Sequence, residues 1–128
     1  MEKEKLHLEF LLNDTAKNIL WTAISTVAGL ETWFAVHVVS DGKVFTFEWS
    51  QNERRSATII AERTCSFIRF HWNDDEDSRS YFEIKMNQDE LTNSFVLEIN
   101  DIVNRDELDD MKELWTSQVT KMRRVLGF

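Results

Sequence analysis

Three histidines and one cysteine are the side chains best suited to metal or nucleophilic chemistry. His7, His37 and His71 lie far apart in the sequence, and no two have the spacing of a metal-binding pair such as His-x-x-x-His. Cys65 flanks a predicted strand, with no basic or helix-terminal group evident to activate its thiol. We therefore expect no metal ion, no cofactor and no catalytic residue at these positions.

Two groups of charged residues are the next candidates for a site. The acidic run 74–77 lacks the alternating ligands, the glycine and the closing glutamate of a calcium loop, which favours a solvated hairpin tip. Arg69, His71 and Glu83 could meet across neighbouring strands, but strand alternation places them on a polar face, away from the apolar interior. We interpret them as a solvated cross-strand charge cluster. Motifs for phosphate, dinucleotide or serine-hydrolase chemistry are absent from the sequence.

Length and composition limit the class of protein. A chain of 128 residues with 42% hydrophobic and 12% aromatic residues fits one globular domain over 1–128. The net charge of −8 argues against nucleic acid as a partner, because binding to phosphate backbones depends on lysine and arginine. The apolar runs are too short to cross a bilayer, and the N-terminus lacks the hydrophobic region of a signal peptide. We expect a cytoplasmic protein without membrane insertion.

The elements that position these residues begin with a strand and a helix. Alternating hydrophobicity predicts a strand over 5–12. Asn13, Asp14 and Thr15 then offer N-cap side chains for a helix that ends at Gly29, which we interpret as its C′ residue. One short helical turn is expected over 30–34. The apolar positions of the first helix recur every three or four residues: Ala16, Ile19, Leu20, Ala23, Ile24 and Val27.

The middle of the chain predicts an antiparallel meander. Strands are expected near 35–40, 43–50, 56–62, 66–73, 79–86 and 93–100, and Asp41-Gly42 favours a type I′ hairpin turn. One parity of most strands is apolar and the other is polar, which indicates a sheet with one dry face. The apolar residues are Phe45, Phe47 and Trp49; Ile68, Phe70 and Trp72; Phe82, Ile84 and Met86; and Phe95, Leu97 and Ile99.

The last segment predicts a long amphipathic helix that covers this dry face. Asn104 and Glu107 form a candidate capping box, and Gly127 ends the helix. Its apolar stripe contains Leu108, Met111, Trp115, Val119, Met122 and Leu126. The expected fold is α+β: a curved antiparallel sheet of about seven strands, in the order β-α-α-β6-α, wrapped around the C-terminal helix.

Local motifs along this order narrow the prediction. They are the segment Leu20-Trp21-Thr22-Ala23-Ile24-Ser25, then Gly29, Leu30, Trp33 and Phe34, the strands 41–49 and 67–72, and Trp115. With these motifs the chain resembles the helix-grip fold of the START-like superfamily, also called SRPBCC, which includes birch-pollen allergens and polyketide cyclases. Within it, the chain is similar to the branch of the activator of the heat-shock-chaperone ATPase.

The resemblance implies a cavity between the sheet and the C-terminal helix that accepts a hydrophobic small molecule. We expect binding of an apolar or amphipathic ligand, lipid-like or aromatic, with the short second helix near Trp33 and Phe34 as a gate. The same aromatic residues could instead simply fill the core. The expected lining residues are Trp33, Phe34, Phe47, Trp49, Phe70, Trp72, Phe82, Ile84, Leu97, Trp115, Val119 and Met122.

Two other functions stay open at this point. A protein-interaction module of the co-chaperone type would use a protein partner, an acidic surface and exposed apolar residues; Trp21 is either such a residue or partly buried under a loop. A cyclase- or hydrolase-type enzyme would need a buried titratable residue in the cavity, and the sequence offers no obvious candidate.

Overall fold

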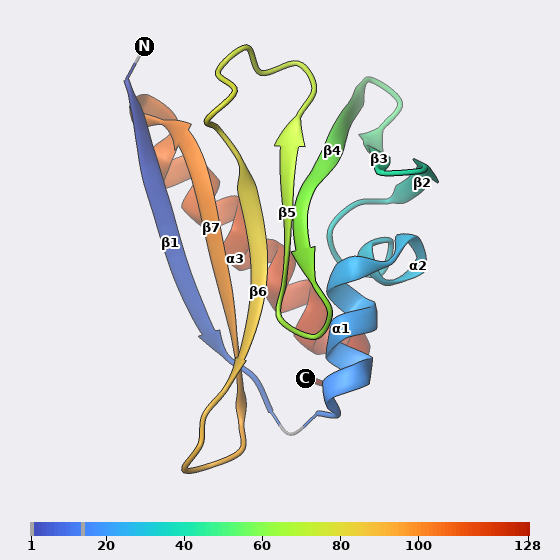
Figure 1. Cartoon of the computed structure of the whole chain (residues 1–128), viewed down its shortest axis with the longest axis vertical. Helices are drawn as coiled ribbons and strands as arrows, with labels where there is room; N and C mark the ends of the chain where they lie inside the picture. The colour runs from blue at the N-terminus through green and yellow to red at the C-terminus, as the bar shows by residue number, and fades with distance from the viewer. Residues whose placement is uncertain (1, 14) are drawn as a thin grey trace.

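The computed structural model describes residues 2–13 and 15–128. Figure 1 shows a curved sheet with two short helices near one edge and a long helix across one face. The elements follow in the order β1 (Lys3–Leu11), α1 (Lys17–Ser25), α2 (Val27–Leu30), β2 (His37–Asp41), β3 (Val44–Ser50), β4 (Glu53–Arg63), β5 (Phe67–Trp72), β6 (Phe82–Gln88), β7 (Phe95–Asn104), the 3-10 turn η1 (Arg105–Glu107) and α3 (Leu108–Leu126). The predicted α+β helix-grip architecture is confirmed.

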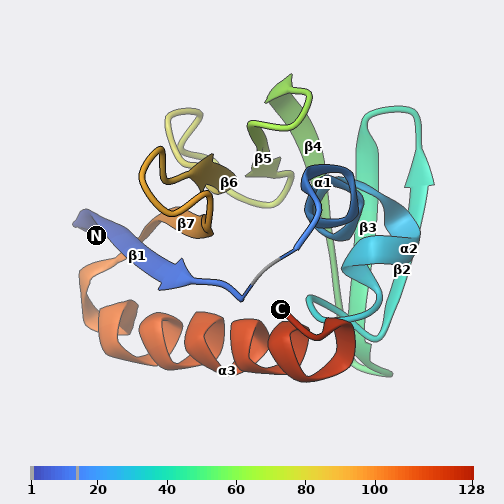
Figure 2. The same ribbon diagram turned by 90° about the horizontal axis from the view of Figure 1, so that it is seen from below.

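The seven strands form one antiparallel sheet in the order β1-β7-β6-β5-β4-β3-β2. Within the described part of the chain, only the pairing of β1 with β7 joins strands far apart in the sequence. Register shifts after Glu48 in β3 and after Ile59 in β4 mark irregularities on that side of the sheet, where bulges typically bend strands. The sheet curves over α3, as the view from below shows (Figure 2).

The core lies between the concave face of the sheet and α3. The predicted apolar parity is confirmed: all of its members are buried except Trp49 and Trp72, which are half-buried. The predicted stripe of α3 also faces inward, with Trp115, Val119 and Met122 fully buried. None of the described helices is long and apolar enough to cross a membrane.

The first helical region differs from the prediction, because one continuous helix to Gly29 is wrong. Thr26 adopts an extended conformation and separates α1 from α2. Its hydroxyl donates to the Thr22 carbonyl at 2.8 Å and accepts from the Gly29 amide at 2.9 Å. Gly29 lies inside α2, where an added Cβ would be 2.0 Å from the Thr22 carbonyl oxygen. Its role is therefore close packing of α2 on α1, not helix termination.

Helix starts were the least predictable features. The N-cap of α1 is Ala16, without a side-chain cap; Asp14, a predicted capping residue, is outside the described residues. The capping box of Asn104 and Glu107 is also wrong, because η1 precedes α3 and neither residue makes a side-chain cap. Ile19, assigned to the buried stripe, is 57% exposed, whereas Trp21 is half-buried against the core.

Two glycine turns have left-handed backbone. Asp41 pairs with Val44, so the central residues of the β2–β3 turn are Gly42 and Lys43, and of these only Gly42 has a positive φ, of 60°. This fits a type II′ turn rather than the predicted type I′, which needs positive φ at both central positions. Gly127, at φ 76°, caps α3 as predicted, and its amide donates to the Arg123 carbonyl at 2.9 Å.

Candidate functional site

The convex face of the sheet carries the charged residues that the sequence placed on the polar side. Arg69 on β5 is directly opposite Glu83 on β6, and its guanidinium donates to one carboxylate oxygen of Glu83 at 2.7 and 2.9 Å. Glu83 is only 6% exposed, so the prediction of a solvated cluster is wrong for this residue. His71 does not join the pair: its Nδ1 lies 2.8 Å from the Ser80 carbonyl.

A chain of hydrogen bonds continues from Glu83 to β1. The Asn100 amide nitrogen donates to the second oxygen of Glu83 at 3.0 Å. The Asn100 carbonyl oxygen therefore faces Nδ1 of His7, at 2.6 Å, and this nitrogen must carry the proton because an amide oxygen only accepts. Nε2 of His7 lies 3.2 Å from Glu9. The hydrogen bonds to Asn100 and then to Glu9 raise the pKa of His7 above its ordinary value of 6.5.

His7, Glu9 and Glu98 bring three potential metal-ligand atoms within 4.8 Å of one another. The sequence did not reveal this group, because Glu98 is on β7 and reaches the other two through the pairing of Glu9 with Glu98. All three residues are on the polar parity, on the opposite face of the sheet from α3. None of the three lines the cavity between the sheet and α3.

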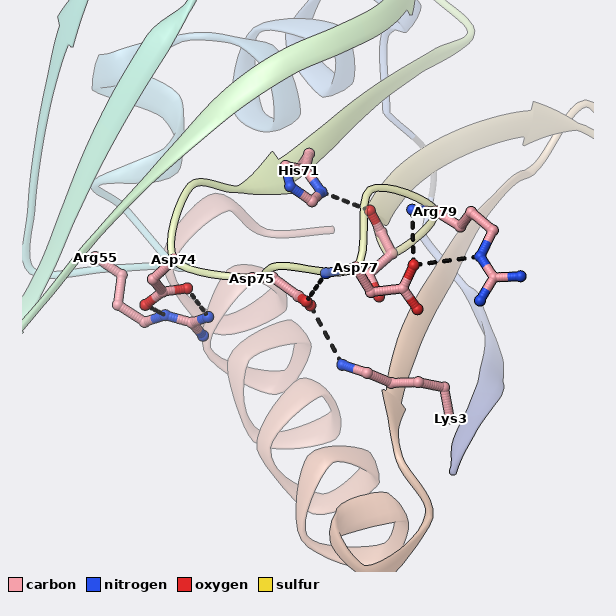
Figure 3. A network of polar contacts seen from close by, with 8 residues as sticks. Lys3, Arg55, His71, Asp74, Asp75, Asp77 and Arg79 are labelled. Carbon is pink, nitrogen blue, oxygen red and sulfur yellow. Dashed lines mark hydrogen bonds and ion pairs between the residues drawn. The ribbon is translucent and has the colours of Figure 1, made fainter. Parts of the chain in front are cut away.

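The acidic run 74–77 lies in the loop between β5 and β6, as predicted, and most of its carboxylates have cation partners (Figure 3). Asp74 accepts from Arg55 at 2.7 and 3.0 Å, and Asp75 accepts from Lys3 at 3.2 Å. The hydrogen bond with Arg55 holds the pKa of Asp74 below its usual value. These contacts attach the loop to β4 and β1.

A cavity of about 410 Å³ lies between the sheet and α3, beside the β3–β4 turn. Strands of the sheet line one side of this cavity, and α3 lines the opposite side. Its lining residues are Phe34, Trp49, Glu53, Arg55, Trp72, Phe82, Asp101, Met111, Leu114, Trp115 and Gln118. Aromatic rings therefore dominate the walls, with a small number of polar groups among them.

The aromatic wall is held by ring contacts and by two hydrogen bonds. The ring centroid of Phe82 lies 4.8 Å from that of Trp72 and 5.7 Å from that of Phe34. The Phe34 carbonyl accepts from the Trp49 indole at 2.7 Å and from the Gln118 amide at 2.9 Å. The segment after α2 is thus fixed to both β3 and α3, which preorganises this side of the cavity.

Among the described residues, one titratable side chain is buried in this cavity. Asp101, on β7, has the inward parity of Leu97 and Ile99 and is 5% exposed. One of its carboxylate oxygens accepts from the Trp115 indole at 2.9 Å. Burial raises the pKa of Asp101 to about 6, against the hydrogen bond from Trp115 and the charges of Arg55 and Lys3, which lower it.

Asp101 was not an obvious candidate in the sequence, and the cause is a strand boundary. The predicted strand ended at residue 100, whereas β7 continues to Asn104. Extending the alternation of Phe95, Leu97 and Ile99 by two residues places Asp101 inside. The signal was therefore present in the sequence.

Five of the twelve predicted lining residues surround the cavity: Phe34, Trp49, Trp72, Phe82 and Trp115. Trp33 lines a more open groove of about 670 Å³, shared with Phe34 and Trp49, along the other side of α3. The remaining six are buried in the core outside both hollows: Phe47, Phe70, Ile84, Leu97, Val119 and Met122. Contact of any of the twelve with a ligand stays a prediction.

The predicted gate has a different local structure. Trp33 and Phe34 lie in the turn after α2 rather than in a helix. The Trp33 indole donates to the Ala23 carbonyl at 2.8 Å, which attaches this turn to α1.

A family model of a START-like superfamily domain matches residues 1–128. The solution structure of BfR322 from Bacteroides fragilis is 63% identical, with a TM-score of 0.68 over 100% of this chain and 94% of that chain. Among curated proteins, none matches the chain.

Two more distant structures share the fold. The Aha1 dimer from Colwellia psychrerythraea is 10% identical, with a TM-score of 0.70 over 93% of this chain and 90% of that chain. DynU16, from the dynemicin biosynthetic locus, is 12% identical, with a TM-score of 0.78 over 96% of this chain and 47% of that chain. At these identities the likeness concerns the fold alone.

Proposed function

The chain belongs to the START-like superfamily, and from this premise we propose that it binds a small apolar or amphipathic molecule in the cavity between its sheet and α3. START-like domains bind small hydrophobic ligands. The observation that carries the proposal is the aromatic cavity of about 410 Å³ with a carboxylate buried in its wall. We place this activity in the cytoplasm.

The size and lining of the cavity support this function. Sites for small molecules typically measure about 300–1,000 Å³ and combine apolar walls with few polar groups. Here Trp49, Trp72 and Trp115 offer large ring faces, and each aromatic contact with a ligand adds apolar burial at about 25 cal/mol per Å². The hydrogen bonds to the Phe34 carbonyl hold one wall in place before binding, which reduces the entropy cost of association.

The test is a thermal-shift screen of the purified protein against fatty acids, sterols, flavonoids and other aromatic compounds, including aromatic amines. A ligand that binds only the folded state raises the unfolding temperature in a saturable way. We expect one chemical class to raise it by several degrees. An absence of shift with every class, from folded protein, would contradict the proposal and favour the interaction module, for which capture of a defined protein partner is the next measurement.

A matched pair of variants locates the binding. Trp72 and Trp21 are both half-buried tryptophans, but only Trp72 lines the cavity. Trp72→Leu should weaken binding of the active class by about tenfold, the loss expected for about 1.4 kcal/mol of contact energy. Trp21→Leu should leave the affinity at its wild-type value. Equal effects of the two substitutions would place the ligand elsewhere.

A further inference from the structure

We propose, building on the cavity binding above, that Asp101 anchors a positively charged amine, so that the ligand is a small ammonium compound with an apolar body. Three features support this anchor: the incomplete hydrogen bonding of Asp101, the pairing of the nearby cations, and the aromatic rings that surround the same space.

Asp101 has unused capacity to accept hydrogen bonds. Among the described residues, the Trp115 indole is the one donor to its carboxylate, and it bonds to Oδ2. An ionised carboxylate can accept about four hydrogen bonds, and a buried charge is costly unless it is paired and hydrogen-bonded. An ammonium group in the cavity would supply both the N–H donors and the opposite charge.

The cations closest to Asp101 already have other partners. Arg55 lines the cavity, but its guanidinium makes two hydrogen bonds to Asp74 and stacks over Trp72, at 4.0 Å from the ring centroid. Lys3 on β1 is paired with Asp75 (Figure 3). Arg55 and Lys3 are each shared with an aspartate, and among the charged residues that line the cavity Asp101 and Glu53 outnumber Arg55. The interior therefore favours a cationic ligand over an anionic one.

The aromatic rings favour the same charge. Trp49, Trp72 and Trp115 line the cavity together with Phe34 and Phe82. The face of an aromatic ring attracts a cation within about 6 Å, by about 0.5–2 kcal/mol, and tryptophan does so most strongly. A fatty acid would instead bring a second carboxylate toward Asp101 and lose this attraction. The net charge of −8 also attracts cations at long range.

Amine binding should depend on the protonation of Asp101. Its direct neighbours on β1 and β6, Leu6 and Phe82, are apolar. The Trp115 indole donates to it from α3, Glu53 and Arg55 of β4 line the same cavity, and the charge of Lys3 on β1 also acts on it. Because the pKa of Asp101 is raised to about 6, a falling pH protonates the carboxylate and removes the anchor. The affinity for an amine should then fall by about tenfold per pH unit below this value.

The experiment is calorimetric titration at about pH 7.5 with three compounds of one shape: tryptamine, tryptophol and indole-3-propionic acid. Tryptamine should bind at least tenfold more tightly than tryptophol, and the acid should bind most weakly. Asp101→Asn should reduce the tryptamine affinity at least tenfold, to that of tryptophol. The control Asp110→Asn, on the exposed surface of α3, should keep the preference for the amine.

The outcomes distinguish the proposal of an amine anchored by Asp101 from the proposal of ligand binding in the cavity. Equal affinities for the three compounds, unchanged in Asp101→Asn, would refute the amine anchor and leave the proposal of cavity binding intact. Absence of binding by all three would also overturn it, and the thermal-shift screen decides separately whether the cavity binds another class. If Asp101→Asn does not fold, titration of the wild-type protein at about pH 5 replaces it, because tryptamine stays charged there and only unchanged affinity would contradict the anchor.

Discussion

Replacement of Asp101 by asparagine should change how the stability of the protein depends on pH. The carboxylate is buried and accepts a hydrogen bond from the Trp115 indole. Desolvation therefore opposes its ionisation in the folded state. Asparagine has nearly the same shape and keeps a carbonyl oxygen that can accept from the indole. The substitution removes the titration without emptying the site.

The sign and size follow from the pKa of Asp101, which burial raises from 3.8 to about 6. A raised pKa means that the neutral acid is favoured by folding, so its contribution is complete below about pH 3.8 and is lost as the pH rises through about 6. At about 1.36 kcal/mol per pH unit the full loss is about 3 kcal/mol. Between about pH 4.5 and pH 7.5 it amounts to about 2 kcal/mol.

The assay is urea unfolding followed by tryptophan fluorescence at both pH values. The difference in unfolding free energy between Asp101→Asn and the wild type should increase by about 2 kcal/mol, in favour of the variant, from the lower to the higher pH. Asp110→Asn should follow the wild type. Parallel pH dependence of the wild type and Asp101→Asn would refute the reasoning, because Asp101 would then titrate alike in the folded and unfolded states.

Other predictions concern the helix junction, the β2–β3 turn and the convex face. Gly29→Ala should destabilise the protein by about 3 kcal/mol or more in urea unfolding, because its Cβ would meet the Thr22 carbonyl oxygen at 2.0 Å. Gly42→Ala has open space and should cost only about 1 kcal/mol for its positive φ; equal losses would contradict this packing role. An NMR titration should give His7 a pKa above 6.5, lowered by Asn100→Ala. The contribution of protonated His7 to the stability of the protein should be complete below about pH 6.5 and should fade as the pH rises through the pKa of His7 in the folded state. An unchanged pKa of His7 in Asn100→Ala would refute the hydrogen-bond assignment.

Strand and core positions were predictable because a period of two, once set, determines every side chain of a strand. Phe45, Phe70 and Ile84 are buried as their parity requires. The break at Thr26 was not predictable from periodicity, because it depends on a threonine that bonds to both flanking helical turns. The predicted start of α3 is also wrong. The 3-10 turn η1 precedes this helix, and neither Asn104 nor Glu107 makes a side-chain cap.

The cavity was harder to predict than the fold. Rings such as Trp72 and Phe70 have the same parity on one strand, yet Trp72 borders the cavity and Phe70 is packed in the core. The difference comes from register: Phe70 is paired with Phe82, the first residue of β6, whereas Trp72 lies beyond this pairing, where β5 ends and the acidic loop begins. Sequence patterns give the face of a residue, whereas a cavity depends on where neighbouring elements separate.

The most direct test of amine binding in this cavity is the response of the indole N–H signals in a nitrogen-15-labelled sample titrated with tryptamine. Five tryptophans give one signal each. The signals of Trp49, Trp72 and Trp115, which line the cavity, should shift in a saturable way. Those of Trp21 and Trp33, outside the cavity, should stay in place. Unmoved cavity signals, or shifts confined to Trp21 and Trp33, would contradict the account.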